Sequence, residues 1–287
     1  MYGIKLGLGA SVGFELPVAE QIRLFRKIGF EAFFTGYDND TAEYRRVADE
    51  CGMIYQSIHA PFDKSAVMWE DEDTARVARE ELIACVERCA EFNVPIMVIH
   101  AYIGFDDKSR GQSAEFYENG IKNYEAVVLR ARELGVKIAI ENTEGEEYLG
   151  ALLGSFKKYD NVGFCWDTGH EMCYNFGKDM TALYGDRLIA THINDNLGIR
   201  DHGGNITWHD DLHLLPFDGI ADFDSVARRI AAVGCPDVLT FELSRMNKPN
   251  RLNNEKYKRM PIEEYLSEAY ARACRVGALV KKYEAQR

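Results

Sequence analysis

The chain has 287 residues, of which 46% are hydrophobic and 28% are charged, enough apolar material for one large α/β core. Its formal net charge of -12 argues against nucleic acid or an anionic membrane as a partner, because both would be repelled. No run of about 18 apolar residues and no secretory signal is present, so we expect a cytoplasmic protein without a membrane span. Seven scattered cysteines without a C-x-x-C pair predict reduced thiols.

Short apolar runs of strand length alternate with segments of helical period along the whole chain. Strands are expected at Ile4–Leu8, Ala32–Thr35, Tyr55–His59, Ile96–His100, Lys137–Glu141, Val162–Asp167, Leu188–Ile193 and Val238–Leu243. Helices are expected at Pro17–Ile28, Thr41–Cys51, Asp73–Phe92, Ala114–Leu134, Leu149–Lys158, Met180–Tyr184, Phe223–Val233 and Pro261–Glu284. Because parallel strands need a crossover, this order predicts a parallel sheet, and eight units fit a (β/α)8 TIM barrel with residues 1–287 as a single domain.

Two long connections follow the last two strands, where barrel enzymes carry their active-site loops. Asn194–Leu212 is rich in glycine, histidine and aspartate. Ser244–Met260 is basic and contains Arg245, Lys248, Arg251, Lys256, Lys258 and Arg259 against the single acidic Glu255. This second loop is interpreted as a solvated flap, a lid, a phosphate contact or a subunit contact.

Six successive strands carry a metal-competent side chain at the C-terminal end of an apolar run. These residues are His59, His100, Glu141, Asp167, His192 and Glu242. A single carboxylate at such a place is often a helix cap, and a single histidine is often part of the packing. In a closed barrel, however, all six ends surround one axis. Carboxylates gathered there repel one another, and a divalent cation resolves the repulsion, so the set predicts a metal site.

The metal is expected to bind Glu141, Asp167, His192 and Glu242. Three carboxylates and one imidazole favour one Mn²⁺ ion, with Mg²⁺ or Co²⁺ as alternatives. Zn²⁺ remains open because further histidine and aspartate candidates exist, which would bring the site closer to a zinc centre. These candidates are His59, His100, His170, Asp211 and His213.

These motifs resemble the sugar phosphate isomerase/epimerase superfamily of xylose isomerase-like barrels, which also includes the zinc-dependent apurinic endonucleases. The resemblance covers nearly the whole chain. It implies that Glu141 and Glu242 are acid and base as well as metal ligands. It also implies that Glu147 and His170 bind substrate, and we group His59 and His100 with them. The family's arginine six residues after the metal histidine is replaced here by Gly198, and the nearest arginine is Arg200.

The endonuclease branch of the resembled superfamily uses nine ligands for three zinc ions, and each has a counterpart in this sequence. The counterparts are His59, His100, Glu141, Asp167, His170, His192, Asp211, His213 and Glu242. This match leaves a zinc-dependent apurinic endonuclease-like phosphodiesterase as an alternative function.

The leading hypothesis is a metal-dependent isomerase or epimerase that acts on a small sugar or sugar derivative. One of Glu141 and Glu242 would remove a proton next to a carbonyl and the other would return one, through a metal-bound enediolate. A metal-dependent sugar lyase or a C-glycoside-cleaving subunit would use the same groups and stays open. A barrel that only binds sugar or metal is the non-enzymatic alternative. A homo-oligomer is compatible with the sequence.

Overall fold

A single parallel sheet forms the centre of the computed structural model, which describes residues 3–104, 113–200, 207–249 and 251–287. From β1 to β7 each strand pairs with the next one in the sequence, and β1 also pairs with β8, so the order is β7-β6-β5-β4-β3-β2-β1-β8. The strands are β1 (Lys5–Gly9), β2 (Ala32–Gly36), β3 (Ile54–His59), β4 (Ile96–His100), β5 (Lys137–Glu141), β6 (Val162–Asp167), β7 (Leu188–His192) and β8 (Val238–Phe241).

The barrel closes between β7 and β8 through a short set of hydrogen bonds at the ends of the two strands. The backbone N–H of Ile193 donates to the Thr240 carbonyl at 2.9 Å, and the N–H of Glu242 donates to the Ile193 carbonyl at 3.2 Å. The Thr191 hydroxyl accepts a bond from the Thr240 N–H at 3.0 Å and donates to the Thr240 carbonyl at 3.3 Å. This seam joins the strand that carries His192 to the strand that precedes Glu242.

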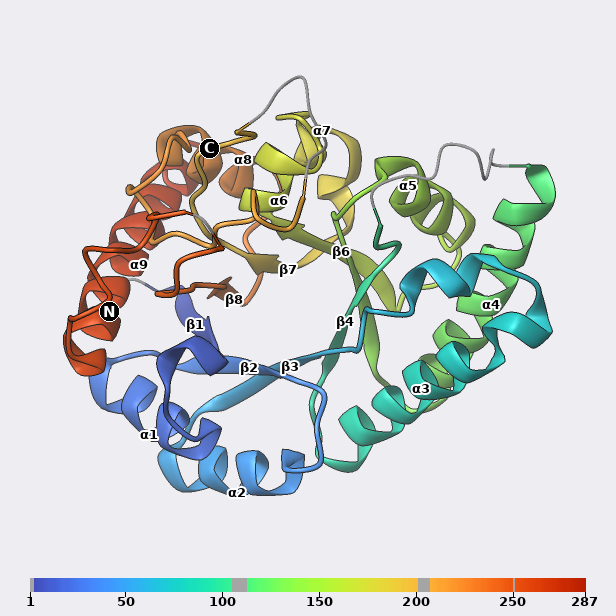
Figure 1. Ribbon diagram of the computed structural model, residues 1–287, viewed down its shortest axis with the longest axis horizontal. Coiled ribbons are helices and arrows are strands. Elements are labelled where there is room, and N and C mark those ends of the chain that lie inside the picture. The colour runs from blue at the N-terminus through green and yellow to red at the C-terminus, as the bar shows by residue number, and fades with distance from the viewer. Residues whose placement is uncertain (1–2, 105–112, 201–206, 250) are drawn as a thin grey trace.

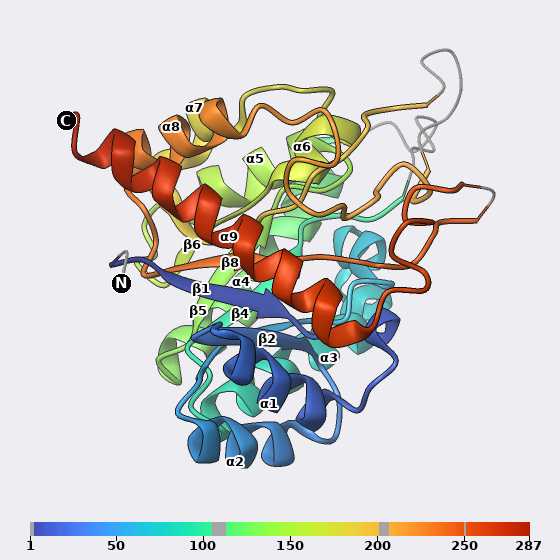
Figure 2. The ribbon, with the colours of Figure 1, turned by 90° about the vertical axis from the view of Figure 1, so that its left-hand side faces the viewer.

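Helices surround the sheet, and the first and last strands lie side by side (Figure 1). The long C-terminal helix crosses the outside of β1 and β8 (Figure 2). The helices are α1 (Val18–Ile28), α2 (Thr41–Cys51), α3 (Glu72–Glu91), α4 (Ala114–Glu133), α5 (Glu146–Ser155), α6 (Thr168–Cys173), α7 (Met180–Tyr184), α8 (Phe223–Val233) and α9 (Ile262–Glu284). Short 3-10 turns occupy η1 (Val12–Phe14), η2 (Ser65–Trp69) and η4 (Gly185–Arg187).

In β4, β5 and β6, successive apolar residues alternate between two cores. In β4, the side chains of Met97 and Ile99 pack in the larger core, between the sheet and the surrounding helices. The side chains on the opposite face of β4, together with residues of β5, β6 and β7, form a separate, smaller cluster that we place inside the barrel. This cluster consists of Ile96, Val98, Ala139, Cys165 and Ala190. Because successive side chains point to opposite faces of a strand, this alternation decides which residue at each strand end enters the barrel mouth.

The prediction of a (β/α)8 TIM barrel is confirmed, and all eight expected strands are present. The expected short helix Met180–Tyr184 is also present. The main differences are that α5 spans Glu146–Ser155 rather than Leu149–Lys158, and that the additional helix α6 follows β6. The bounds of the other expected helices and strands differ by at most two residues. All seven cysteines are free. None of the helices within the described residues combines the length and apolar composition needed to cross a membrane.

Candidate metal centre

The alternation of the strands directs four of the predicted residues into the barrel mouth. His100 lies two residues after Val98, and Glu141 lies two residues after Ala139. Asp167 and His192 follow Cys165 and Ala190 with the same spacing. These four polar residues therefore continue the inward-facing rows, at the C-terminal ends of β4 to β7.

Glu141, Asp167, His192 and Glu242 form one group whose potential ligand atoms all lie within 4.8 Å of one another. The Nδ1 atom of His192 lies 3.2 Å from Glu141 Oε1 and 3.2 Å from Glu242 Oε2. Glu141, Asp167 and His192 are almost completely buried, whereas the Glu242 side chain is 29% exposed. The arrangement offers three carboxylates and one imidazole to a single cation.

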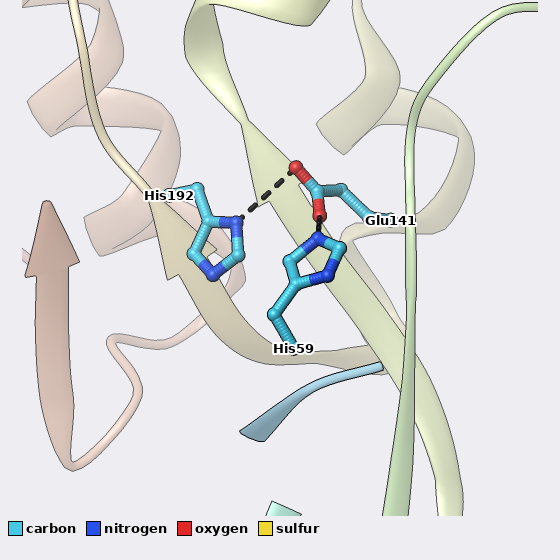
Figure 3. A group of neighbouring side chains, drawn as sticks. All are labelled: His59, Glu141 and His192. Atoms are coloured by element: carbon cyan, nitrogen blue, oxygen red, sulfur yellow. Dashed lines mark hydrogen bonds and ion pairs between the residues drawn. The ribbon is translucent and has the colours of Figure 1, made fainter. Parts of the chain in front are cut away.

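A second group, formed by His59, Glu141 and His192, shares two residues with the first. The imidazoles of His59 and His192 reach the Glu141 carboxylate from different strands and contact different oxygens (Figure 3). The Nε2 of His59 lies 3.3 Å from Glu141 Oε2 and 3.2 Å from the Nε2 of His100. Glu141 therefore stands at the centre of the histidine cluster.

A third group consists of His170, Asp211 and His213. Asp211 and His213 belong to the loop after β7, and His170 belongs to α6. Asp211 Oδ2 is 2.7 Å from His213 Nε2 and 3.5 Å from His170 Nε2. His170 also approaches Glu141 Oε1 with its Nδ1 at 3.2 Å, which connects this group to the strand-end residues. The structure thus brings all nine candidate ligands into one continuous network.

Backbone carbonyls orient three of these histidines. The Nδ1 atoms of His59, His170 and His213 lie 2.9, 3.1 and 3.3 Å from the carbonyl oxygens of Ala60, Asn142 and Glu242. An Nδ1–H that donates to a carbonyl leaves the Nε2 lone pair directed into the site. This is the usual orientation of metal-binding histidines in proteins.

Several polar atoms in the centre are buried without a hydrogen-bond partner, which tests whether a metal fits. They are Glu141 Oε1, Asp211 Oδ1, His100 Nδ1 and both ring nitrogens of His192. Buried polar atoms are rarely left in this state, because the loss of hydration is costly. A divalent cation at the Glu141–Asp167–His192–Glu242 group would satisfy Glu141 Oε1 and one ring nitrogen of His192 together, so the residues fit a metal.

Asparagine side chains hold Asp167 in place. The Nδ2 of Asn194 donates to Asp167 Oδ2 at 2.8 Å, and the backbone N–H of His170 donates to Asp167 Oδ1 at 2.6 Å. Asn142 accepts from the Asp167 backbone N–H at 2.8 Å and donates to the Asp167 carbonyl at 2.9 Å. Asp167 is therefore both the N-cap of α6 and a fixed carboxylate of the site.

The buried charges shift one another's pKa values. Burial raises the pKa of Asp167 to about 7, with Glu141 and Glu242 adding to the rise against the opposing charge of His170. Burial also opposes the charge on Glu242, but His213 and His192 outweigh it and lower its pKa to about 2. The pKa of His192 is raised well above its ordinary value, because Cys165, Glu141 and Glu242 overcome the effect of burial.

The pKa of His100 moves in the opposite direction, since burial lowers it to about 4 despite the nearby Glu141. The carboxylates thus draw protons onto some of their histidine neighbours and leave His100 neutral. A divalent cation would supply the positive charge that these protons otherwise provide.

Glu147 is a predicted site residue, but it lies outside the network of nine candidate ligands. It is exposed in the first turn of α5. Glu144 is buried instead, and burial raises its pKa, with His170 and Asp211 close enough to influence its charge. Glu144 was not singled out from the sequence, where no spacing distinguished it from the neighbouring acidic residues.

The basic loop after β8 is largely paired with acidic residues of the chain. Arg245 contacts Glu15, and Arg251 contacts Asp210. Lys248 differs, because its Nζ lies 4.0 Å from Oδ2 of Asp211, one of the candidate ligands. The sequence predicts a solvated flap, a lid, a phosphate contact or a subunit contact for this loop, and the structure places one of its lysines beside the network of candidate ligands.

The sequence matches a family model described as a xylose isomerase-like TIM barrel over residues 13–264. The uncharacterized protein y4fM of Sinorhizobium fredii is 32% identical over 225 residues, which are 69% of this chain and 69% of that protein. A probable endonuclease 4 of Mycoplasma mycoides subsp. mycoides is 25% identical over 188 residues. That match spans 59% of this chain and 60% of the relative, less than two thirds of its length.

Three solved structures share the fold at low sequence identity. An IolI protein solved with a bound zinc atom has a TM-score of 0.74 and 20% identity, covering 98% of this chain and 99% of that one. The 3-keto-D-glucoside 4-epimerase YcjR of E. coli has a TM-score of 0.71 and 14% identity, covering 95% and 99%. D-psicose 3-epimerase of Clostridium cellulolyticum H10, solved with D-tagatose, has a TM-score of 0.70 and 15% identity, covering 95% and 99%.

Proposed function

The chain belongs to the xylose isomerase-like TIM barrel family, and we propose that it is a divalent-metal-dependent isomerase or epimerase of a sugar or sugar derivative. The observation that carries the proposal is the convergence of Glu141, Asp167, His192 and Glu242 within 4.8 Å. Three carboxylates and one imidazole favour one ion of Mn²⁺, with Mg²⁺, Co²⁺ or Zn²⁺ as alternatives. The ion, when bound, would polarise a substrate carbonyl.

Glu141 and Glu242 are the proposed acid and base. Both approach Nδ1 of His192, so both belong to the group that would hold the ion. One carboxylate takes a proton from the carbon next to the carbonyl, and the other returns a proton. Return to the opposite face of the same carbon gives an epimer, and return to the neighbouring carbon gives an isomer.

The substrate-binding roles proposed for His59, His100 and His170 rest on their contacts with Glu141, between 3.2 and 3.5 Å. His100 is neutral at ordinary pH and can exchange hydrogen bonds with sugar hydroxyls. Glu147 is proposed as a substrate contact only through the resemblance to the epimerases. Glu144 is the better-placed carboxylate for hydroxyl binding, because it is buried near His170 and Asp211.

The proposal is tested by exchange of carbon-bound protons with deuterated water, measured by NMR over a panel of free and phosphorylated ketoses and keto-glycosides. The native protein loaded with Mn²⁺ should label one substrate class at a single carbon. Glu141→Gln and Glu242→Gln should each reduce labelling by about 10²-fold or more, the size expected for loss of a general acid or base. Undiminished labelling in both variants would exclude this mechanism.

A second function is favoured by the continuity of the nine-residue network. The additional His170–Asp211–His213 group could allow more than one metal, and a site with several zinc ions would activate water for phosphodiester hydrolysis. This activity would be metal-dependent cleavage at an abasic site. Cleavage of an abasic duplex by the zinc-loaded protein, at a rate that falls with added salt, would support it. A net charge of -12 weighs against it.

A further inference from the structure

Lys248 brings a positive charge to one end of the histidine network. Its Nζ lies 4.0 Å from Oδ2 of Asp211, and its side chain is only 18% exposed. Within the described residues, the ion pairs of Glu141, Asp167 and Glu242 all involve histidines and no lysine or arginine. The two ends of the network therefore differ in charge: an ammonium stands beside Asp211, and none from the described part of the chain pairs with the strand-end carboxylates.

The loop holds the backbone of Lys248, and an aromatic ring lies beside its ammonium. The backbone N–H of Lys248 donates to Asn253 Oδ1 at 3.0 Å, and its Nζ lies 5.1 Å from the centroid of the Trp208 ring. The buried Asn254 closes the loop by donating to the carbonyls of Ser244 and Met246 at 2.9 and 3.0 Å. A lysine held by its own loop and by an aromatic face is a preorganised charge.

Asp211 has the features of a ligand for a second cation. It is buried, its Oδ1 has no hydrogen-bond partner, and its Oδ2 lies between the Nε2 atoms of His170 and His213. A divalent ion bound by these three residues would lie close to the ammonium that already contacts Oδ2. Like charges at such a separation in a partly buried site repel strongly, so Lys248 and a second metal ion compete for Asp211.

We propose that Lys248 takes the place of a second metal ion at the His170–Asp211–His213 group and thereby limits this chain to one divalent ion, at the strand ends. The inference rests on the proposed single-metal function and deepens it, because it names the residue that separates this barrel from a multi-metal hydrolase. Lys248 acts by its charge, so a neutral side chain of similar length should restore metal binding at Asp211.

The test is metal stoichiometry, measured by elemental analysis after saturation with Zn²⁺ and dialysis. The native protein should retain one Zn²⁺ per chain and Lys248→Met should retain two. In a calorimetric titration, the second equivalent should bind about tenfold or more tightly in Lys248→Met than in the native protein, as expected when a like charge is removed. Lys248→Arg keeps the charge and should stay at one.

Two further variants control for the loop and for the position of the second ion. Lys258→Met removes a charge from the same loop, but this lysine is 68% exposed and pairs with Glu255 on the surface. The Lys258→Met protein should therefore still retain one Zn²⁺ per chain. The double variant Lys248→Met/Asp211→Asn should return to one. Unchanged thermal melting of the metal-free Lys248→Met protein, relative to the metal-free native protein, verifies that the fold is kept.

The inference is overturned if Lys248→Met retains one ion with its fold intact, or if the native protein already retains two or three. The proposed function is tested separately by proton exchange in the native protein. One bound ion without exchange on any sugar of the panel would reject the function, while the stoichiometry of the Lys248 variants would still decide the inference.

Discussion

The Nδ2 of Asn194 donates a hydrogen bond to Oδ2 of Asp167 over 2.8 Å, in the fully buried base of the candidate metal centre. Asn194 is held in turn by Thr168, whose hydroxyl accepts from the Asn194 N–H at 2.9 Å. The bond orients one carboxylate oxygen while leaving it a lone pair for a cation. Groups of this kind affect metal affinity although they do not touch the metal.

Asn194→Ala should therefore weaken metal binding without removing a ligand. We expect a loss in affinity of about 10- to 100-fold, the usual effect of removing a group that orients a ligand. Competition with a chromophoric chelator measures it. Asn161→Ala is the matched control. Asn161 lies just before β6, and its side chain donates to the carbonyls of Val128 and Val136 rather than to a candidate ligand. Equal affinities of the two variants would contradict the role assigned to Asn194.

Metal binding should release protons and weaken as the pH falls below about 7. The pKa of Asp167 is raised to about 7, so below this pH the metal-free protein holds a proton there that the ion must displace. His192, whose pKa is also raised, adds a further proton. Affinity should fall by about tenfold per pH unit for each proton released. Calorimetry at pH 6 in buffers of different ionisation enthalpy counts the protons, and a count of zero would refute the prediction.

Removal of the metal should destabilise the protein. The four proposed ligands come from β5, β6, β7 and the residue after β8, so the ion can bind all four only in the folded state. Such an ion stabilises the folded state by about 4 kcal/mol when its free concentration is about 1,000 times Kd. Chelation should lower Tm by about 10 °C for a chain of this size. Differential scanning calorimetry with and without EDTA measures the change. Glu242→Gln, with one ligand impaired, should show a smaller difference.

Arg229 should be important for stability although it lies outside the centre. Its guanidinium makes two bonds of 2.7 Å to the buried Glu171 of α6, and it lies 4.4 Å from the centroid of the Trp166 ring. Arg229→Met leaves Glu171 with an unpaired buried charge and should cost about 3 kcal/mol in the free energy of unfolding. The neighbouring Arg228, paired with Asp224 on the surface, is the control, and Arg228→Met should change the stability far less than Arg229→Met. Urea unfolding distinguishes the two, and equal midpoints would contradict the assignment.

The fold was predictable because strand and helix periods alternate without interruption, and each expected strand lies within two residues of its observed bounds. Helix α6 was missed because it has only six residues, too few to show a period, and includes Gly169. Its start depends on the Asp167 side chain, which caps it. The first turn of α5 was missed because Glu146 and Glu147 carry no apolar signal.

Six of the nine candidate ligands were predictable because each lies at the end of an apolar strand, and closure of a barrel brings strand ends together. His170, Asp211 and His213 lie outside the strands, and the resemblance to the endonuclease branch connected them with the site. The residues that support the ligands were not predictable. Asn142 and Asn194 occur at positions without a recognisable spacing, and their bonds to Asp167 depend on the contact between neighbouring strands. The position of Lys248 depends on how the loop after β8 folds back over Asp211. Loops of this kind are shaped by contacts remote in the sequence.

The closure between β7 and β8 has a consequence for how the protein folds. These strands meet through the Thr191 hydroxyl and the bonds around Ile193, and His192 and Glu242 lie immediately beside this junction. An ion bound by both His192 and Glu242 would connect β7 to β8 at the junction where the barrel closes. Because such an ion would need ligands from both strands, a spectroscopic signal from a bound Co²⁺ would report whether the ends of β7 and β8 have come together.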